Sequence, residues 1–276
     1  MKIKIGAGIL VLFALVAVLG PLLISADPAA TSEAGLQGPS AEHWLGTTQT
    51  GQDILVQTVY GARVSLGVGV LSALIATMLA IAVGLIGGYV GGVVDEVLSV
   101  LTNIFLVLPA LPLIIVLAGY LPQRGVASVA VVIAVTGWAW GARVLRAQTL
   151  SVRRRDFVQA ARASGEGPLR IVFYEIMPVL LPVIATSFLA TVVAAILAEA
   201  GLSFLGLADL STVSWGSMLY FAQNGQALLI GAWWWFIPPG LCIALIGTGL
   251  ALVNFGIDEI ANPRLRTIKV PRKARA

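Results

Sequence analysis

The sequence is 276 residues long, 58% of them hydrophobic and 11% charged, and its mean hydropathy is +0.96. Soluble domains of this size usually carry about 25% charged residues, so this composition indicates a chain whose solvent is a lipid bilayer. A single cysteine (Cys242) and a single histidine (His43) exclude an intramolecular disulfide and a metal cluster built on histidines.

Six apolar segments are long enough to cross a bilayer core of about 30 Å, which takes roughly 20 helical residues. Residues 1–25 form the first predicted membrane helix, because the apolar stretch at 5–24 exceeds the core of about 7–15 residues that is typical of a signal peptide. Residues 26–62 form a predicted external loop. Apolar side chains at nearly helical spacing from Asp53 to Leu66 predict a short interfacial helix that leads into the second span.

The second span is predicted at about residues 64–94, which is too long for one straight crossing. Its glycine-rich end, Gly87 to Gly92, predicts a turn before the next span. The third span, residues 97–121, contains Pro109 and Pro112, and we therefore expect a kinked helix.

The last three spans are predicted at residues 126–142, 179–198 and 236–257. A polar stretch at 203–227 separates the last two, and the three tryptophans at 233–235 indicate an aromatic belt at the membrane surface. Together with the second and third spans, these segments form a predicted five-helix core at residues 63–260.

The basic residues predict the orientation. Fifteen of the seventeen lie before the first span, between the fourth and fifth spans, or after the sixth: Lys2, Lys4, Arg143, Arg146, Arg153, Arg154, Arg155, Arg162, Arg170, Arg264, Arg266, Lys269, Arg272, Lys273 and Arg275. With six spans these three places share one side, which the positive-inside rule assigns to the cytoplasm. Only Arg63 and Arg124 fall opposite. We expect cytoplasmic termini, a basic cytoplasmic tail at residues 261–276, and no nucleic-acid partner.

Motifs of covalent chemistry are absent. The sequence has no G-x-x-x-x-G-K-[ST], H-E-x-x-H or G-x-S-x-G pattern, so we expect neither catalytic residues nor a metal site and no hydrolysis of ATP by this chain. Hydropathy places one acidic residue, Glu199, at the outer end of the fifth span. It is either a structural carboxylate, exposed at the helix end or bonded to the amides of the Gly201–Ser203 turn, or a gate at the outer mouth of a pore.

The basic cytoplasmic loop, residues 150–178, carries the most informative pattern. Asp156 is a good N-cap for a short alanine-rich helix over the next eight residues, and Gly165 can end that helix in the left-handed conformation. Pro168 suits the first turn of a second short helix, and Pro178 then opens the fifth span. The loop is either an ordinary charged loop or a rigid connection between a soluble motor and the membrane helices.

Part of this loop resembles the coupling loop of ABC-importer permeases, in which E-A-A is followed four residues later by Gly and then by a distal Pro. The matching residues are Gln159-Ala160-Ala161, Gly165 and Pro178, with Gln159 in place of the usual Glu. The resemblance implies that the loop docks on ATPase subunits. The residues that we expect to take part are Asp156, Phe157, Gln159, Ala160, Ala161, Gly165, Leu169 and Pro178.

Nearly the whole chain resembles the dipeptide and oligopeptide permeases of the DppC/OppC type. The segments that carry the resemblance are His43–Thr47, Gly51–Leu55, Tyr60–Leu66, Gly87–Gly92, Leu197–Gly206, Ser214–Gly216 and Asn262–Arg266. Each segment is weak alone, and their order along the chain makes the resemblance specific.

The resemblance implies an all-α, polytopic fold of the type I ABC importer permeases, in the plasma membrane of a prokaryote. It implies a pore-forming permease for dipeptides or oligopeptides, paired with a second permease in a heterodimer. The further partners would be two ATPase subunits or a fused pair, which bind ATP and Mg, and an external substrate-binding protein. Alternatives are an importer of nickel, glutathione or haem, a stand-alone secondary transporter, and a purely structural membrane scaffold.

Overall fold

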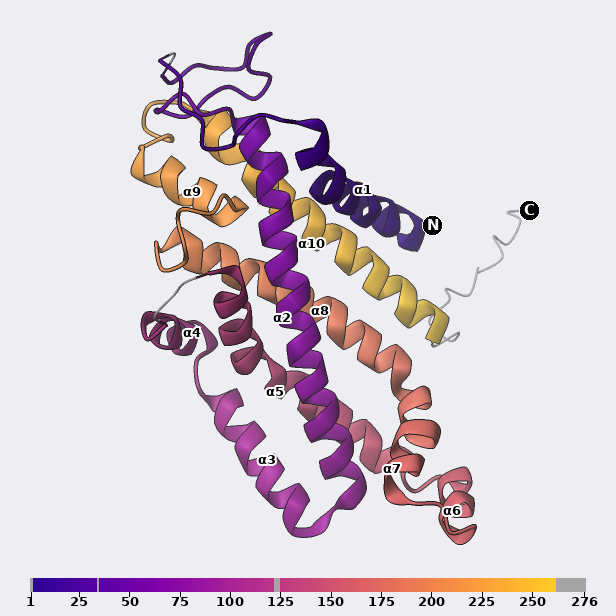
Figure 1. The fold of residues 1–276 in the computed structure, drawn as a ribbon. Helices are drawn as coiled ribbons and strands as arrows, with labels where there is room; N and C mark the ends of the chain where they lie inside the picture. Colours follow the sequence, from indigo (N-terminus) through magenta and orange to yellow (C-terminus); the bar gives the residue numbers. More distant parts are fainter. Residues whose placement is uncertain (1, 34, 122–124, 262–276) are drawn as a thin grey trace, which may run out of the picture.

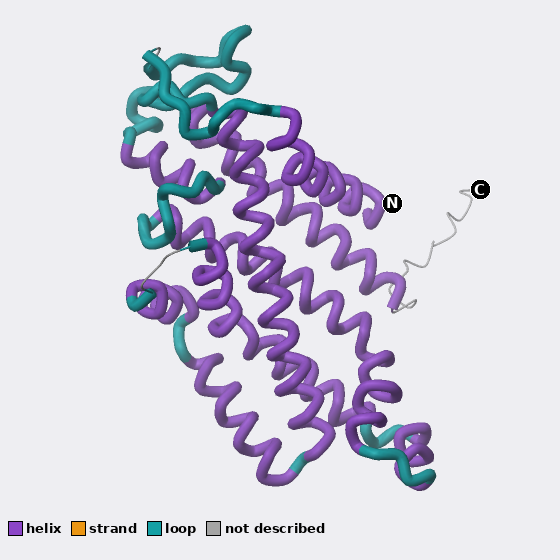
Figure 2. The backbone as a smooth tube through the Cα atoms, in the orientation of Figure 1, coloured by secondary structure: helices purple, strands orange, loops and turns teal. Residues whose placement is uncertain are grey.

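The computed structural model describes residues 2–33, 35–121 and 125–261, and all the regular secondary structure in this part of the chain is helical (Figures 1 and 2). Its only β-type pairing is an isolated bridge between Thr47 and Asp53. Five helices are long and apolar enough to cross a membrane, or six if one bent pair counts as a single span. The expectation of an all-α chain with about six spans is therefore confirmed.

Helices α1 (Lys2–Leu23) and α10 (Trp233–Ala261) lie side by side at one edge of the bundle (Figure 1). The two helices can approach closely because Gly6 has no side chain. A Cβ at this position would stand only 2.6 Å from the Gly249 carbonyl oxygen. A 2.8 Å salt bridge between Lys2 and Glu259 joins the start of α1 to the end of α10. Both ends therefore lie on one side of the bundle.

The longest helix is α2 (Ile54–Val90), whose 37 residues span about 55 Å at 1.5 Å per residue. The predicted interfacial helix from Asp53 to Leu66 is therefore wrong as a separate element. Its residues form the first turns of α2, because no proline or helix-ending glycine interrupts the sequence there. Asp53 caps the helix by accepting a 3.1 Å hydrogen bond from the Val56 amide.

The turn predicted at the end of the second span is found, but it is shorter than predicted. Gly87 and Gly88 remain helical, and the chain reverses at Gly91 (φ +73°) and Gly92 (φ +58°). A Cβ on Gly88 would stand 2.8 Å from that of Thr149, so this glycine serves close packing of α2 against α5.

The predicted kinked third span is two helices, α3 (Gly92–Val107) and α4 (Ala110–Gly119), whose axes differ by 91°. Pro109 is the N-cap residue of α4, with extended backbone angles. Pro109 has no amide hydrogen and disfavours a helical residue before it, so the helix breaks here rather than bending.

Helices α5 (Val126–Val152) and α8 (Met177–Phe204) both run beyond their predicted ends. Arg146 consequently lies on α5, where it forms a salt bridge with Asp95 of α3. The extension of α8 places Glu199 inside the helix rather than at its end. The polar stretch before the last span contains a further helix that was not predicted, α9 (Trp215–Asn224).

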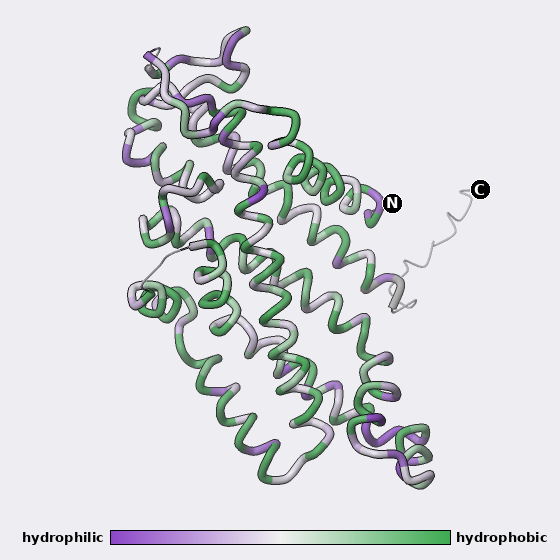
Figure 3. The backbone as a smooth tube through the Cα atoms, viewed as in Figure 1, coloured by the Kyte–Doolittle hydropathy of each residue, from purple (hydrophilic) through white to green (hydrophobic). Residues whose placement is uncertain are grey.

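Apolar residues cover the long helices, whereas hydrophilic residues gather at the outer loop and around α6 (Figure 3). Large apolar side chains such as Leu12, Val18 and Val107 are more than half exposed. Such surfaces suit contact with lipid or with other membrane chains. At the head of α10, Trp233 is exposed and Trp235 is buried, and their place at a membrane surface stays a prediction. Arg124 and the basic tail from residue 262 onwards lie outside the described residues.

Candidate functional site

The basic loop at residues 150–178 contains a short helix, α6 (Asp156–Ala163), which lies at the opposite end of the bundle from the loop that joins α1 to α2 (Figure 1). The predicted left-handed stop is confirmed, since Gly165 has φ +80°. Its amide donates to the Arg162 carbonyl at 3.0 Å and the Glu166 amide donates to the Ala161 carbonyl at 3.1 Å. This pair of bonds is a Schellman motif, which ends the helix and reverses the chain. Asp156 is not the predicted N-cap but the first helical residue, because the backbone of Arg155 is already in the cap conformation.

A second helical stretch begins at Pro168, as predicted, with the three-residue helix α7 (Pro168–Arg170). The fifth span does not open at Pro178, however. A π-helical turn, η1 (Ile171–Ile176), joins α7 to α8 without a break, and the Met177 amide bonds to the Val172 carbonyl. Pro178 has no amide hydrogen to donate, and the helix tolerates it because the wider π-helical turn comes directly before it.

Helix α6 is fixed to the bundle on one face. Val158 is fully buried in an apolar cluster with Ile171 and Val172. The Arg162 guanidinium lies 4.8 Å from the centre of the Tyr89 ring, and its Nε donates to the Tyr89 hydroxyl at 3.3 Å. Tyr89 lies in the last turn of α2, and Ile171 and Val172 belong to the helical turn that leads into α8, so these contacts join α6 to the ends of both helices.

The opposite face of α6 is open. Asp156, Phe157, Gln159 and Ala160 are exposed there, whereas Ala161 is half-buried and packs on the cluster beneath the helix. The Gln159 amide group also donates to the Arg153 carbonyl at 3.1 Å, which orients its side chain along the loop. The structure therefore places four of the eight predicted docking residues on the open face of α6 and turns Ala161 inward.

Leu169 of α7 and Phe173 and Tyr174 of η1 are also exposed. The two aromatic residues were not predicted as part of the site. Their signal in the sequence was an adjacent aromatic pair that follows a strongly basic segment and lies outside the predicted span.

A buried carboxylate near the end of α8 forms a second polar centre. Glu199 is only 3% exposed and accepts hydrogen bonds from three serine hydroxyls: Ser203 at 2.8 Å, Ser214 at 2.8 Å and Ser65 at 3.1 Å. The Ser65 hydroxyl also accepts from the Trp215 amide at 3.2 Å. This network ties α2, α8 and α9 together.

The expected position of Glu199 at an exposed helix end is therefore wrong, and so are the expected bonds to backbone amides. The helix continues past Gly201, so the amides of that turn are used within α8. Ser214 was not predicted as a partner of Glu199 because α9, which it caps, was not predicted. Its sequence signal was a cap pattern, since Ser214 and Ser217 form a reciprocal capping box at the start of the helix.

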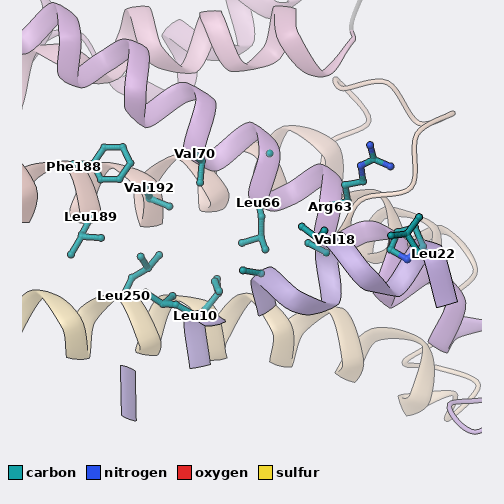
Figure 4. A pocket seen from close by; sticks show the side chains of 15 residues that line it. Leu10, Val18, Leu22, Arg63, Leu66, Val70, Phe188, Leu189, Val192 and Leu250 are labelled. Atoms are coloured by element: carbon teal, nitrogen blue, oxygen red, sulfur yellow. The ribbon is translucent and has the colours of Figure 1, made fainter. Parts of the chain in front are cut away.

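A cavity of about 650 Å³ forms an apolar groove between α1, α2, α8 and α10 (Figure 4). Arg63 is the one charged residue among the described residues that line it, and it lies at the end next to Leu22. A smaller cavity of about 490 Å³ lies between α2, α4, α5 and α8. Among the described side chains, no group of three metal-binding residues is found.

Residues 76–267 match the family described as "Binding-protein-dependent transport system inner membrane component". The chain is 35% identical over 265 residues to the dipeptide transport system permease protein DppC of Bacillus subtilis (strain 168), covering 95% of this chain and 81% of that protein. It is 34% identical over 266 residues to the oligopeptide transport system permease protein OppC of the same organism, covering 95% of this chain and 85% of that protein. The chain is also 34% identical to the oligopeptide transport system permease protein OppC of Mycobacterium bovis (strain ATCC BAA-935 / AF2122/97). This match covers 95% of this chain and 90% of that protein.

The fold is similar to that of a chain in the MetNI methionine ABC transporter, solved in inward-facing conformations. The TM-score is 0.59, and the match covers 75% of this chain and 96% of that chain at 19% identity. At this identity the likeness supports the fold alone, and it confirms the expected ABC importer permease fold.

Proposed function

The chain belongs to the family of binding-protein-dependent transport system inner membrane components and is a permease subunit of an importer, and we propose that this importer carries dipeptides or oligopeptides. The observation that carries the proposal is the match at 34–35% identity, over 95% of this chain, to permeases of dipeptide and oligopeptide systems. The part of the chain before residue 76, which the family match does not include, is covered by these relatives as well.

The exposed face of α6 is the proposed docking surface for an ATPase subunit. Three features support this role: an apolar residue open to solvent in Phe157, a fixed turn at Gly165, and a rigid attachment of the inner face through Val158. A partner that moves α6 would move the ends of α2 and α8 with it, since α6 contacts Tyr89 of α2 and runs into α8 through η1. The loop can therefore couple closure of a motor to a change of access in the pore.

The remaining partners of the proposed complex are a second permease, two ATPase subunits or a fused pair, and an external substrate-binding protein. ATP and Mg would be bound by the ATPase subunits, because this sequence has no phosphate-binding loop. The termini and α6 would face the cytoplasm, in accordance with the basic residues at that end.

Uptake by a reconstituted complex tests the proposal. Labelled di- and tripeptides should accumulate in vesicles that contain this chain, its partners and internal ATP, and accumulation should stop when the ATPase subunits are left out. Accumulation by this chain alone in an imposed ion gradient would instead establish a secondary transporter. Accumulation of nickel, glutathione or haem but not of peptides would overturn the peptide assignment and keep the importer.

A further inference from the structure

The groove of about 650 Å³ between α1, α2, α8 and α10 is open at the surface of the bundle (Figure 4). Four residues of α2 line it, at a spacing of three, four and seven residues that places them on one face of the helix: Arg63, Leu66, Gly67 and Val70. Gly67 and Val70 are exposed although they line the groove. A Cβ on Gly67 would meet no other atom within 4 Å, so there is free space beside it.

A single charge stands at one end of this groove. Arg63 is the one charged residue among the described residues that line it, and its side chain is exposed. It lies next to Leu22, and its guanidinium extends away from the apolar walls (Figure 4). Within the described part of the chain the guanidinium has no hydrogen bond or ion pair. Its five N–H donors therefore remain available to an anion, and their planar arrangement matches a phosphate group.

The charged end of the groove lies at the depth expected for lipid headgroups. The 22 residues of α1 span about 33 Å, close to the bilayer core of about 30 Å, so each end of α1 reaches a membrane surface. Arg63 lies near the end of α1 at Leu23. One turn before Arg63, the Tyr60 hydroxyl donates to the Ile24 carbonyl at 2.9 Å, and tyrosine is enriched at membrane surfaces.

The length of the apolar wall agrees with the thickness of one leaflet. Along α1 the lining runs from Leu22 to Leu10, which is roughly 18 Å at 1.5 Å per residue. One leaflet contributes about 15 Å of hydrocarbon, half of the bilayer core. A chain that enters beside Arg63 would therefore reach the far end of the groove, where Leu10 and Leu250 lie together (Figure 4).

We propose that this groove binds one anionic phospholipid, with the phosphate on the Arg63 guanidinium and one acyl chain along α1. A phospholipid combines an anion with a long apolar chain, and the groove offers a surface for each. A free phosphate would leave the apolar walls uncovered, whereas a neutral hydrocarbon would leave the guanidinium without a partner. The bound chain would fill the space between α1 and α8 and hold α1 against the bundle. This site is independent of the transported substrate.

The test uses phosphatidylcholine vesicles that contain the complete complex and a trace of a photoreactive lipid. The probe is phosphatidylglycerol with a diazirine in one acyl chain, and the comparison probe carries the same chains on phosphatidylcholine. Peptide mass spectrometry compares labelling of Phe188 and Leu189, inside the groove, with labelling of Leu12 and Leu19, which are exposed on the other face of α1. In the wild-type complex this ratio should be about fivefold higher for phosphatidylglycerol than for phosphatidylcholine.

Variants of Arg63 test the headgroup. Arg63→Gln removes the charge and should lower the ratio for phosphatidylglycerol about fivefold, to the level of phosphatidylcholine. Arg63→Lys keeps the charge and should retain most of the preference.

A variant of Gly67 tests the chain. Gly67→Phe places a ring in the free space of the groove and should remove groove labelling by both lipids. Gly8→Phe is the matched control, because Gly8 is exposed on α1 outside the lining and a Cβ there also meets no atom within 4 Å. It should leave the ratio unchanged. Should Gly67→Phe fail to assemble, the comparison of Arg63→Gln with Arg63→Lys decides alone.

Equal labelling by the two lipids in the wild-type complex, or an unchanged preference in Arg63→Gln, would overturn the site, since the groove would then hold bulk lipid without recognition of the headgroup. Labelling of Leu12 and Leu19 without any labelling of the groove would also overturn it, because another chain of the complex would then cover the groove. Neither outcome bears on the peptide importer, which is tested by uptake.

Discussion

The Ser214 hydroxyl donates a 2.8 Å hydrogen bond to the Glu199 carboxylate, which fixes the start of α9 to the interior of α8. The same hydroxyl accepts the Ser217 amide at 3.1 Å, so the cap of α9 and the carboxylate share one side chain. Gly216 completes the contact, because a Cβ there would stand 2.7 Å from that of Ser203. The carboxylate thus organises a tightly packed corner of three helices, which supports the structural interpretation of Glu199 rather than a gate.

Replacement of Glu199 should separate charge from hydrogen bonding. An amide in Glu199→Gln keeps an acceptor for the serines of α8 and α9 and can donate to Ser65, so the complex should retain most of its uptake. Glu199→Leu leaves three buried hydroxyls without this acceptor, at a cost of about 1–3 kcal/mol for each. We therefore expect less assembled complex and a lower unfolding temperature for the leucine variant, measured on purified complexes.

The gate interpretation makes the opposite forecast for the glutamine variant. If Glu199→Gln assembles, hydrolyses ATP at the wild-type rate and yet takes up no peptide, the charge itself is required. Ser203→Ala is a useful control, because it removes one donor and keeps the carboxylate, and it should be tolerated better than Glu199→Leu.

The spans could be predicted from the sequence because length and hydropathy alone decide whether a helix crosses a bilayer. The ends of the helices were harder to predict from the sequence. The fourth span is predicted to end at residue 142, whereas α5 continues to Val152, and its Arg143 and Arg146 bond to Asn103 and Asp95 of α3. Such pairs let charged residues remain helical, and a single sequence does not show which segments will pack together.

The two sites differ in how much the sequence could specify. The turn at Gly165 is local, and a glycine after an alanine-rich helix predicts it without knowledge of the tertiary fold. The serine cage of Glu199 draws on Ser65 and Ser214, which lie far apart in the sequence, so it depends on the packing of α2, α8 and α9. The same holds for the inward orientation of Ala161, which follows from the apolar cluster beneath α6.

Gly165 should be sensitive to substitution and Gly167 should not. A β-branched residue at φ +80° carries a steric cost of about 1–2 kcal/mol, so Gly165→Val should distort the loop, weaken co-purification of the ATPase and lower uptake. Gly167 has φ −70° and open space around its Cα, and Gly167→Val is the matched control. Wild-type ATPase association and uptake in Gly165→Val would show that the loop conformation is not needed for coupling.

Topology can be tested with single cysteines after replacement of Cys242 by alanine. Ser40 and Ser211 are exposed at the end of the bundle opposite α6, and cysteines there should react with an impermeant maleimide in intact cells. Ser151 is exposed beside the coupling loop, and its cysteine should react only after permeabilisation. A cysteine at Ala276, in the predicted basic tail, should behave like the one at Ser151. If the cysteine at position 151 reacts in intact cells, the proposed orientation is wrong.

Neighbouring alanines on α6 offer the sharpest test of the docking surface, because the structure turns them in different directions. Ala160 is exposed, so Ala160→Trp should leave the permease folded and weaken its association with the ATPase subunits, measured by co-purification. Ala161 packs on the cluster around Val158, so Ala161→Trp must displace α6 and should lower the unfolding temperature of the permease itself; overpacking of this kind typically costs about 1–3 kcal/mol. If Ala160→Trp retains full ATPase association and uptake, this face of α6 is not the docking surface, whatever the behaviour of Ala161→Trp.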